Sequence, residues 1–251
     1  MTDYLKLADA RILIWLNHAL AGHPRLFVAS LLITDKLADM AVLAMGAVLW
    51  VWPHRIPGWR AAEPDAQASV AAARRASRAR LIVFGIGATA AYVTARLIAM
   101  HLDKPRPFAS YLPVLAVPGA FFGLREFGTF PSDHAALLGA LPVAFACWSM
   151  ALGWIWAVAA LLLLALRVAV AFHYPYDMIA GGLIGAVFTA AAMALYDRNA
   201  RVHGLALDVA GHFSRRPHAY VLYGLLAAGA LEFAFHFTHV LAALLWLRAR
   251  L

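Results

Sequence analysis

Two histidines in this sequence could cleave a phosphate ester together with the residues beside them. In "HYPYD", His173 precedes Asp177 by four residues. If the local geometry is near-helical, the Asp177 carboxylate can accept the proton of one ring nitrogen and leave the other nitrogen as a nucleophile. His134, in "PSDH", belongs to a different predicted helix and could protonate the leaving group. The pattern predicts a nucleophile and a general acid from distant parts of the chain.

Cations and a helix start near these histidines could hold the phosphate itself. Arg106 and Arg167 carry permanently charged forks that suit phosphate oxygens, and Lys104 could add a point charge. Ser132 occupies an expected N-cap position, where its hydroxyl and the free N–H groups of a helix starting near Asp133 would make an anion site. We therefore predict a phosphate-binding set made of Arg106, Ser132, Arg167 and Lys104.

Each motif also has an ordinary structural interpretation. "PSDH" could be a capped helix start with a solvated histidine, and "KPRPF" could be a rigid basic loop touching lipid headgroups. Arg167 could extend to a nearby membrane interface. The joint occurrence of the three motifs favours a site, because the charge pattern of the loops places all of them at one membrane face.

The composition predicts an integral membrane protein. Of the 251 residues, 64% are hydrophobic and 14% charged, and the mean hydropathy is +0.74, which is far too apolar for a soluble domain. A formal net charge of +8 would suggest nucleic acid in a soluble chain, but here the distribution of the arginines matters more, and we expect no nucleic-acid partner. The single Cys147 excludes an intrachain disulfide.

Apolar segments of the length needed to cross a bilayer, roughly 20 residues, define the predicted elements. The spans are expected at about 31–52, 81–101, 135–151, 154–172 and 177–196, with a sixth at 219–247. Within 1–24, apolar residues recur every fourth position (Ala8, Ile12, Leu16 and Leu20), which favours an interfacial amphipathic helix over a signal peptide. The predicted fold is an all-α polytopic membrane helix bundle of five to six transmembrane helices.

The whole chain, 1–251, reads as a single membrane domain. Its catalytic core covers about 30–196, 53–80 is a cytoplasmic connector, and 197–251 is a C-terminal connector with an additional helix. Both connectors are rich in arginine and belong inside by the positive-inside rule. Alternating the spans then places 102–134 and the turn 173–176 at the outer face. Arg248 and Arg250 disagree with this topology if the last helix spans completely.

Three blocks together resemble the signature of the type 2 phosphatidic acid phosphatase superfamily of membrane lipid phosphatases. They are "PRP" at 105–107, "PSDH" at 131–134, and the set Arg167, His173 and Asp177. The aspartate of "PSDH", the segment "HYPYD" and the N-terminal "NHALAGHPRLF" are most similar to the bacitracin-resistance type of bacterial undecaprenyl-diphosphatase. The resemblance covers about 30–196.

By this resemblance, His173 is the nucleophile that forms a phosphohistidine, Asp177 orients it, and His134 protonates the departing lipid phosphate. The implied reaction converts undecaprenyl diphosphate to undecaprenyl phosphate without metal or other cofactor. It would take place in the bacterial inner membrane, with the site facing the periplasm or exterior, and would recycle the lipid carrier of peptidoglycan synthesis. The implied partners are the polyprenyl diphosphate substrate and membrane lipids.

Other functions are compatible with the same residues. The phosphoryl group could pass to a lipid acceptor such as lipid A, or the substrate could be phosphatidylglycerol phosphate or phosphatidate. A non-catalytic lipid-binding protein or transporter could use the cationic site for anion recognition, although no repeat supports a transporter. Nothing in the sequence indicates the oligomeric state.

Two positions depart from the pattern of the superfamily. Its first-block lysine is replaced by Ala99 and its third-block serine by Leu166, so we hypothesise that Lys104 or Arg96 supplies the missing cation. On the last predicted helix, Glu232, His236 and His239 have a spacing that could bind metal, but with no further ligand evident they are more simply a polar stripe.

Overall fold

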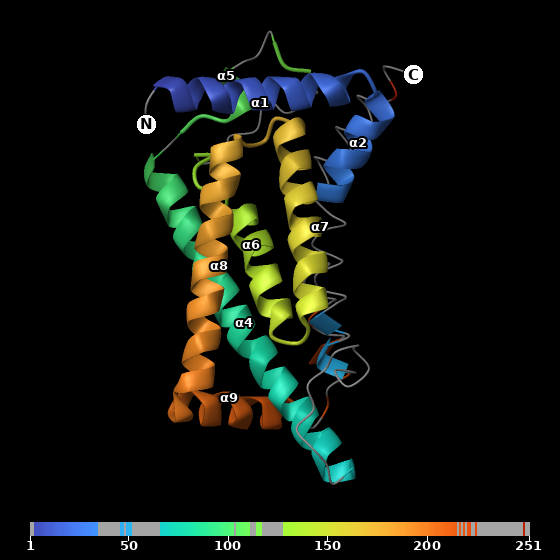
Figure 1. Ribbon diagram of the computed structural model, residues 1–251, viewed down its shortest axis with the longest axis vertical. Helices are drawn as coiled ribbons and strands as arrows, with labels where there is room; N and C mark the ends of the chain where they lie inside the picture. The colour runs from blue at the N-terminus through green and yellow to red at the C-terminus, as the bar shows by residue number, and fades with distance from the viewer. Residues whose placement is uncertain are drawn as a thin grey trace.

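A computed structural model gives the architecture of the protein (Figure 1). It describes residues 3–34, 46–47, 49–51, 66–102, 104–110, 114–116 and 128–214, with isolated positions at 216, 218, 220, 221, 224 and 248. This part of the chain contains helices and no strand. Most of the first predicted span and nearly all of the last, with Glu232, His236 and His239, lie outside the described residues.

Three long helices form the frame of the bundle. They are α4 (Ala66–Leu102), α7 (Met150–Ala169) and α8 (Pro175–Arg198), and each belongs to a helical stretch long and apolar enough to cross a membrane. They overlap the spans predicted at 81–101, 154–172 and 177–196, so the predicted helical membrane bundle is confirmed. The expected connector 53–80 is helical from Ala66 on, because its alanines and arginines are strong helix formers that extend α4.

Helix α6 (Asp133–Ala146) is shorter than the span predicted at 135–151. Its 14 residues rise about 21 Å, less than the roughly 30 Å of a bilayer core. In Figure 1 its N-terminal end lies further into the bundle than the adjacent ends of α7 and α8. The chain entering α6 is thus carried inward, which buries Thr129 and Ser132.

Helices α6 and α8 approach each other backbone to backbone, because glycines of α8 leave the room. A Cβ atom on Gly181 would overlap the carbonyl oxygen of Ser132, and one on Gly185 would overlap that of Ala136. Small residues allow such close approach between membrane helices. The Ser132 N–H also donates to the Asp177 carbonyl at 3.1 Å. The two helix starts that carry the sequence motifs are therefore held together.

We expect Gly185→Ala to lower the free energy of unfolding by about 1–3 kcal/mol, because its new methyl group would have to displace the backbone of α6. Gly182→Ala is the matched control in the same helix, since a Cβ there meets only the Ala135 carbonyl at 3.9 Å. Thermal unfolding of both variants in detergent measures the difference. Equal unfolding temperatures for the two variants would contradict the tight contact.

Helix α1 (Asp3–Ala21) lies across one end of the bundle, and α2 (Pro24–Leu32) then runs down its side (Figure 1). The apolar stripe predicted from Ala8 to Leu20 is only part of the face turned to the bundle. Leu16 and Leu20 pack, partly buried, against the core, but Ile12 is exposed, and Asp9, Leu13 and Asn17 are buried. The reason is that the ends of α7 and α8 present free backbone groups, which the two polar side chains satisfy.

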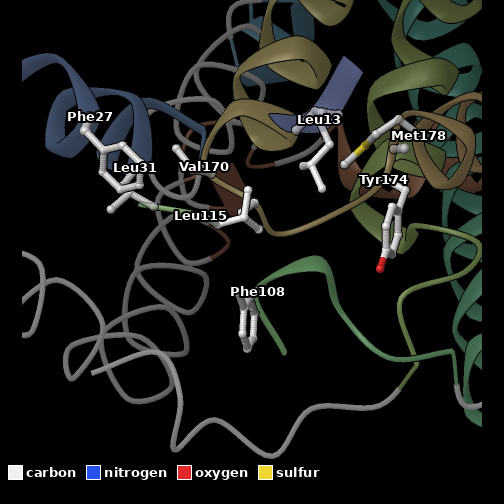
Figure 2. Close-up of a cluster of buried hydrophobic side chains, with 11 residues drawn as sticks. Leu13, Phe27, Leu31, Phe108, Leu115, Val170, Tyr174 and Met178 are labelled. Atoms are coloured by element: carbon white, nitrogen blue, oxygen red, sulfur yellow. The ribbon is translucent and has the colours of Figure 1, made fainter. Parts of the chain in front are cut away.

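These polar contacts lie at the two ends of the short loop between α7 and α8. The Asn17 side chain donates to the carbonyl of Ala169, the last residue of α7, at 2.8 Å, and Asp9 accepts the N–H of Tyr176 in the first turn of α8 at 2.9 Å. Figure 2 shows the apolar cluster beside them, to which α1, α2, α5 (Pro107–Ser110) and this loop contribute. Helix α1 therefore holds both ends of the loop that contains His173.

The opposite end of the bundle collects the arginine-rich segments. Helix α9 (Ala200–Phe213) crosses this end near the start of α4 (Figure 1), and Arg75 of α4 forms an ion pair of 3.0 Å with Asp208 of α9. The two arginine-rich segments thus share one end of the bundle and the His173 loop lies at the other, as the alternation of spans predicts.

Candidate active site

The three sequence blocks meet beneath α1, around one nitrogen of His173. Its Nε2 atom lies 3.4 Å from Ser132 Oγ, at the start of α6, and 3.5 Å from Arg106 Nη1, just before α5. Arg106 Nη1 also donates to the Phe172 carbonyl at 3.1 Å. Two residues that precede His173 by 41 and 67 positions therefore face the same edge of its imidazole.

His173 sits in the loop between α7 and α8, and only 2% of it is exposed. Burial lowers the pKa of His173 well below the usual 6.5, and the charges of Arg106 and Arg167 lower it further. The ring is therefore neutral at neutral pH. A neutral imidazole keeps one lone pair, which a nucleophile requires.

Thr129 connects His173 to Asp177. Its Oγ1 atom lies 2.9 Å from His173 Nδ1 and donates to Asp177 Oδ2 at 2.8 Å, while His173 Nδ1 is 3.9 Å from that oxygen. The predicted direct hydrogen bond is wrong, because α8 begins only at Pro175 and His173 is outside the helical repeat. Asp177 Oδ2 instead accepts the N–H of Tyr174 at 3.0 Å.

The directions of these hydrogen bonds determine the tautomer of His173. The Thr129 hydroxyl has one proton, which it gives to Asp177, so it accepts the proton carried by His173 Nδ1. The Thr129 carbonyl, 3.1 Å from Nδ1, accepts from the same atom. The lone pair is then on Nε2, which faces Ser132 and Arg106. Sequence reasoning missed Thr129, whose only signal was a hydroxyl residue just before "FPSDH".

Lys104 has a carboxylate as its partner. Its ammonium lies 2.7 Å from Asp177 Oδ1 and 4.1 Å from the centre of the Tyr174 ring. The Asp177 side chain is fully buried, and a buried carboxylate needs a nearby cation. Lys104 therefore compensates the negative charge of Asp177. Its ammonium is already paired with this carboxylate before phosphate binds.

Arg167, in the last turn of α7, has donors available for an anion. It is 3% exposed, and its Nη1 donates to the Thr34 carbonyl at 2.8 Å. Its Nε atom is buried without a hydrogen-bond partner among the described residues. An unsatisfied buried donor is costly. This atom and the proximity of Arg167 to His173 fit the predicted phosphate contact.

Ser132 is the N-cap of α6, as predicted. Its Oγ atom accepts the N–H of Ala135 at 3.2 Å, and the side chain is fully buried. The N–H of His134 is bound by Asp133 Oδ1 and that of Ala136 by the Ser132 carbonyl, so the Asp133 N–H and the helix dipole are what this helix end offers an anion. Helix α6 can therefore add a backbone donor beside the two arginines.

His134, in the first turn of α6, is partly exposed. Its Nδ1 atom lies 2.8 Å from Asp133 Oδ1, and the other oxygen of Asp133 lies 3.0 Å from Arg96 Nη1. Arg96, one of the two cations proposed to replace the missing lysine at Ala99, is therefore paired with Asp133. Across the described residues, no three His, Cys, Asp or Glu side chains gather as potential metal ligands.

Comparison with known proteins matches part of the chain to a family. Residues 79–201 match the family model of the PAP2 superfamily, and this range contains all three sequence blocks and helices α6, α7 and α8. No curated protein and no solved structure gives a significant match. PAP2 superfamily members are phosphatases, so the match indicates a phosphatase-type activity on lipid phosphates.

Proposed function

We propose that this chain, whose residues 79–201 match the PAP2 superfamily, hydrolyses the terminal phosphate of undecaprenyl diphosphate and leaves undecaprenyl phosphate. The supporting observation is the neutral, buried His173, whose Nε2 lies next to Ser132 and Arg106. A nucleophilic nitrogen next to donors for phosphate oxygens is the arrangement that phosphoryl transfer through a covalent intermediate needs.

In the first step, Arg106, Arg167, Ser132 and the N-terminal end of α6 hold the terminal phosphoryl group. His173 Nε2 attacks the phosphorus, the bond from phosphorus to the bridging oxygen breaks, and His134 gives its proton to the departing lipid phosphate. The phosphohistidine carries positive charge on its ring. Asp177, connected through the Thr129 hydroxyl, stabilises that charge.

In the second step, neutral His134 takes a proton from water while the water oxygen attacks the phosphohistidine. The phosphorus–nitrogen bond breaks, inorganic phosphate leaves, and both histidines return to their starting states. No step requires a metal ion. The same residue therefore acts first as an acid and then as a base, because loss of its proton in the first step leaves it able to accept one in the second.

A polyprenyl diphosphate suits this site for two physical reasons. Its tail remains in the bilayer while the charged head lies at the interface, at the end of the bundle that carries the loop between α7 and α8. Its leaving group is a phosphate monoester, which needs less acid assistance than an alkoxide. In this proposal the site faces the periplasm or exterior of a bacterial inner membrane, and the reaction recycles the carrier of envelope synthesis.

Phosphate release from the purified protein in detergent tests this proposal. We expect release in the presence of EDTA, faster from undecaprenyl diphosphate than from phosphatidylglycerol phosphate or phosphatidate. Equal rates from the three lipids would contradict the substrate assignment, and dependence on added metal would contradict the mechanism. Radiolabel that appears on added lipid A in place of free phosphate would identify a phosphotransferase.

The lowered pKa of His173 predicts the pH at which the acid limb of the kcat/KM profile lies. A base with a lowered pKa keeps its lone pair at lower pH, so the limb due to His173 should lie below the usual 6.5. Arg106→Gln removes a nearby cation, raises the pKa of His173 and should move this limb to higher pH, as well as slowing the reaction. Using one substrate for both proteins cancels the titration of the substrate. Coincident limbs would contradict the role of Arg106.

A further inference from the structure

We propose that Asp133, anchored by Arg96, is a positioning residue that orients His134 as the general acid. This inference rests on the proposed function. It concerns hydrogen bonds to His134, which are distinct from those that connect His173 to Asp177 through Thr129. The two histidines would then each have a carboxylate behind them: Asp177 for the nucleophile and Asp133 for the acid.

Both oxygens of Asp133 are engaged. Oδ1 lies 2.8 Å from His134 Nδ1 and also accepts the backbone N–H of His134 at 2.7 Å. Oδ2 accepts from Arg96 Nη1 at 3.0 Å. Since each oxygen has its own donor, the carboxylate cannot rotate without losing contacts, and the imidazole of His134 is held at Nδ1.

This contact selects which nitrogen of His134 exchanges protons. Arg96 and the backbone N–H of His134 both donate to Asp133, so its carboxylate acts as an acceptor, and Nδ1 of His134 carries a proton throughout. Nε2 is then the atom that donates to the leaving group. It is also the atom that later accepts from water, so one nitrogen serves both steps of the proposed reaction.

A purely structural role explains these contacts less well. An aspartate in the first turn does favour a helix, but Ser132 already caps α6. The Arg96 side chain is 36% exposed, whereas that of Asp133 is 8% exposed. Burial of a carboxylate is unfavourable unless it is well paired, and the buried carboxylate is directed at the ring of the predicted acid.

A double-mutant cycle on undecaprenyl diphosphate tests the inference. We expect Asp133→Asn to lower kcat by about 100-fold with little change in KM, in the range that general acids contribute. His134→Ala should cost as much or more. The double variant should be no slower than His134→Ala alone, because Asp133 acts only through that ring. Asp133→Glu, which keeps the carboxylate, should recover part of the rate.

Asp208→Asn is the matched control, since it removes the carboxylate of the Arg75 ion pair at the other end of the bundle and should leave kcat unchanged. Thermal unfolding of the Asp133 variants shows whether they fold. Losses that multiply in the double variant, or wild-type kcat in Asp133→Asn, would overturn the inference. An inactive wild-type protein would instead refute the proposed function, so the two failures are distinguishable.

Discussion

His173→Ala is expected to lower kcat for phosphate release by at least about 10⁴-fold, a loss typical of a removed nucleophile. The alanine leaves nothing to attack phosphorus, while Arg106 and Ser132 can still bind the substrate. The substrate should therefore still bind. Stopped reactions measure the covalent intermediate directly, provided they are quenched in alkali, because phosphohistidine is labile in acid.

Radiolabelled substrate separates the two histidines in that experiment. The wild-type protein and His134→Ala should both become labelled, since His134 acts on the leaving group and on water. His173→Ala should remain unlabelled. His203→Ala provides the control, because this exposed histidine stacks on Tyr196 in the opposite half of the bundle. A labelled His173→Ala protein would show that the nucleophile is another residue.

Thr129→Val is expected to lower kcat by about 100-fold with KM nearly unchanged, because the missing hydroxyl separates His173 from the charge of Asp177. The Thr129 carbonyl still accepts from Nδ1, so the ring keeps its orientation and the loss should be smaller than for His173→Ala. Steady-state kinetics on undecaprenyl diphosphate measure both constants.

Thr129→Ser tests whether the hydroxyl causes this effect, since serine retains the bridge and removes only a methyl group. We expect its kcat to stay within about 3-fold of the wild-type value, because only the small packing loss of a methyl group remains. If valine and serine gave the same rate, Asp177 would not act through Thr129. The main role of Asp177 would then be its ion pair with Lys104.

Hydropathy was enough to predict the three long helices α4, α7 and α8, since a bilayer imposes helical structure on apolar segments. It was less informative where a helix is amphipathic or short. The alanine- and arginine-rich segment before α4 continues that helix, and α6 ends earlier than its apolar run suggested. In α1, the buried face contains Asp9 and Asn17, which the predicted apolar stripe did not include.

The sequence by itself determined which side chains could do the chemistry and at which end of the bundle they lie. Residue type fixes what His173, His134, Arg106 and Arg167 can donate or accept, and the alternation of spans brings their segments to one end. The contacts between them depended on the tertiary structure. His173 and Asp177 lie on either side of a helix start, so local spacing could not predict the Thr129 bridge. The pairing of Lys104 with Asp177 and of Arg96 with Asp133 arises where distant helices pack together.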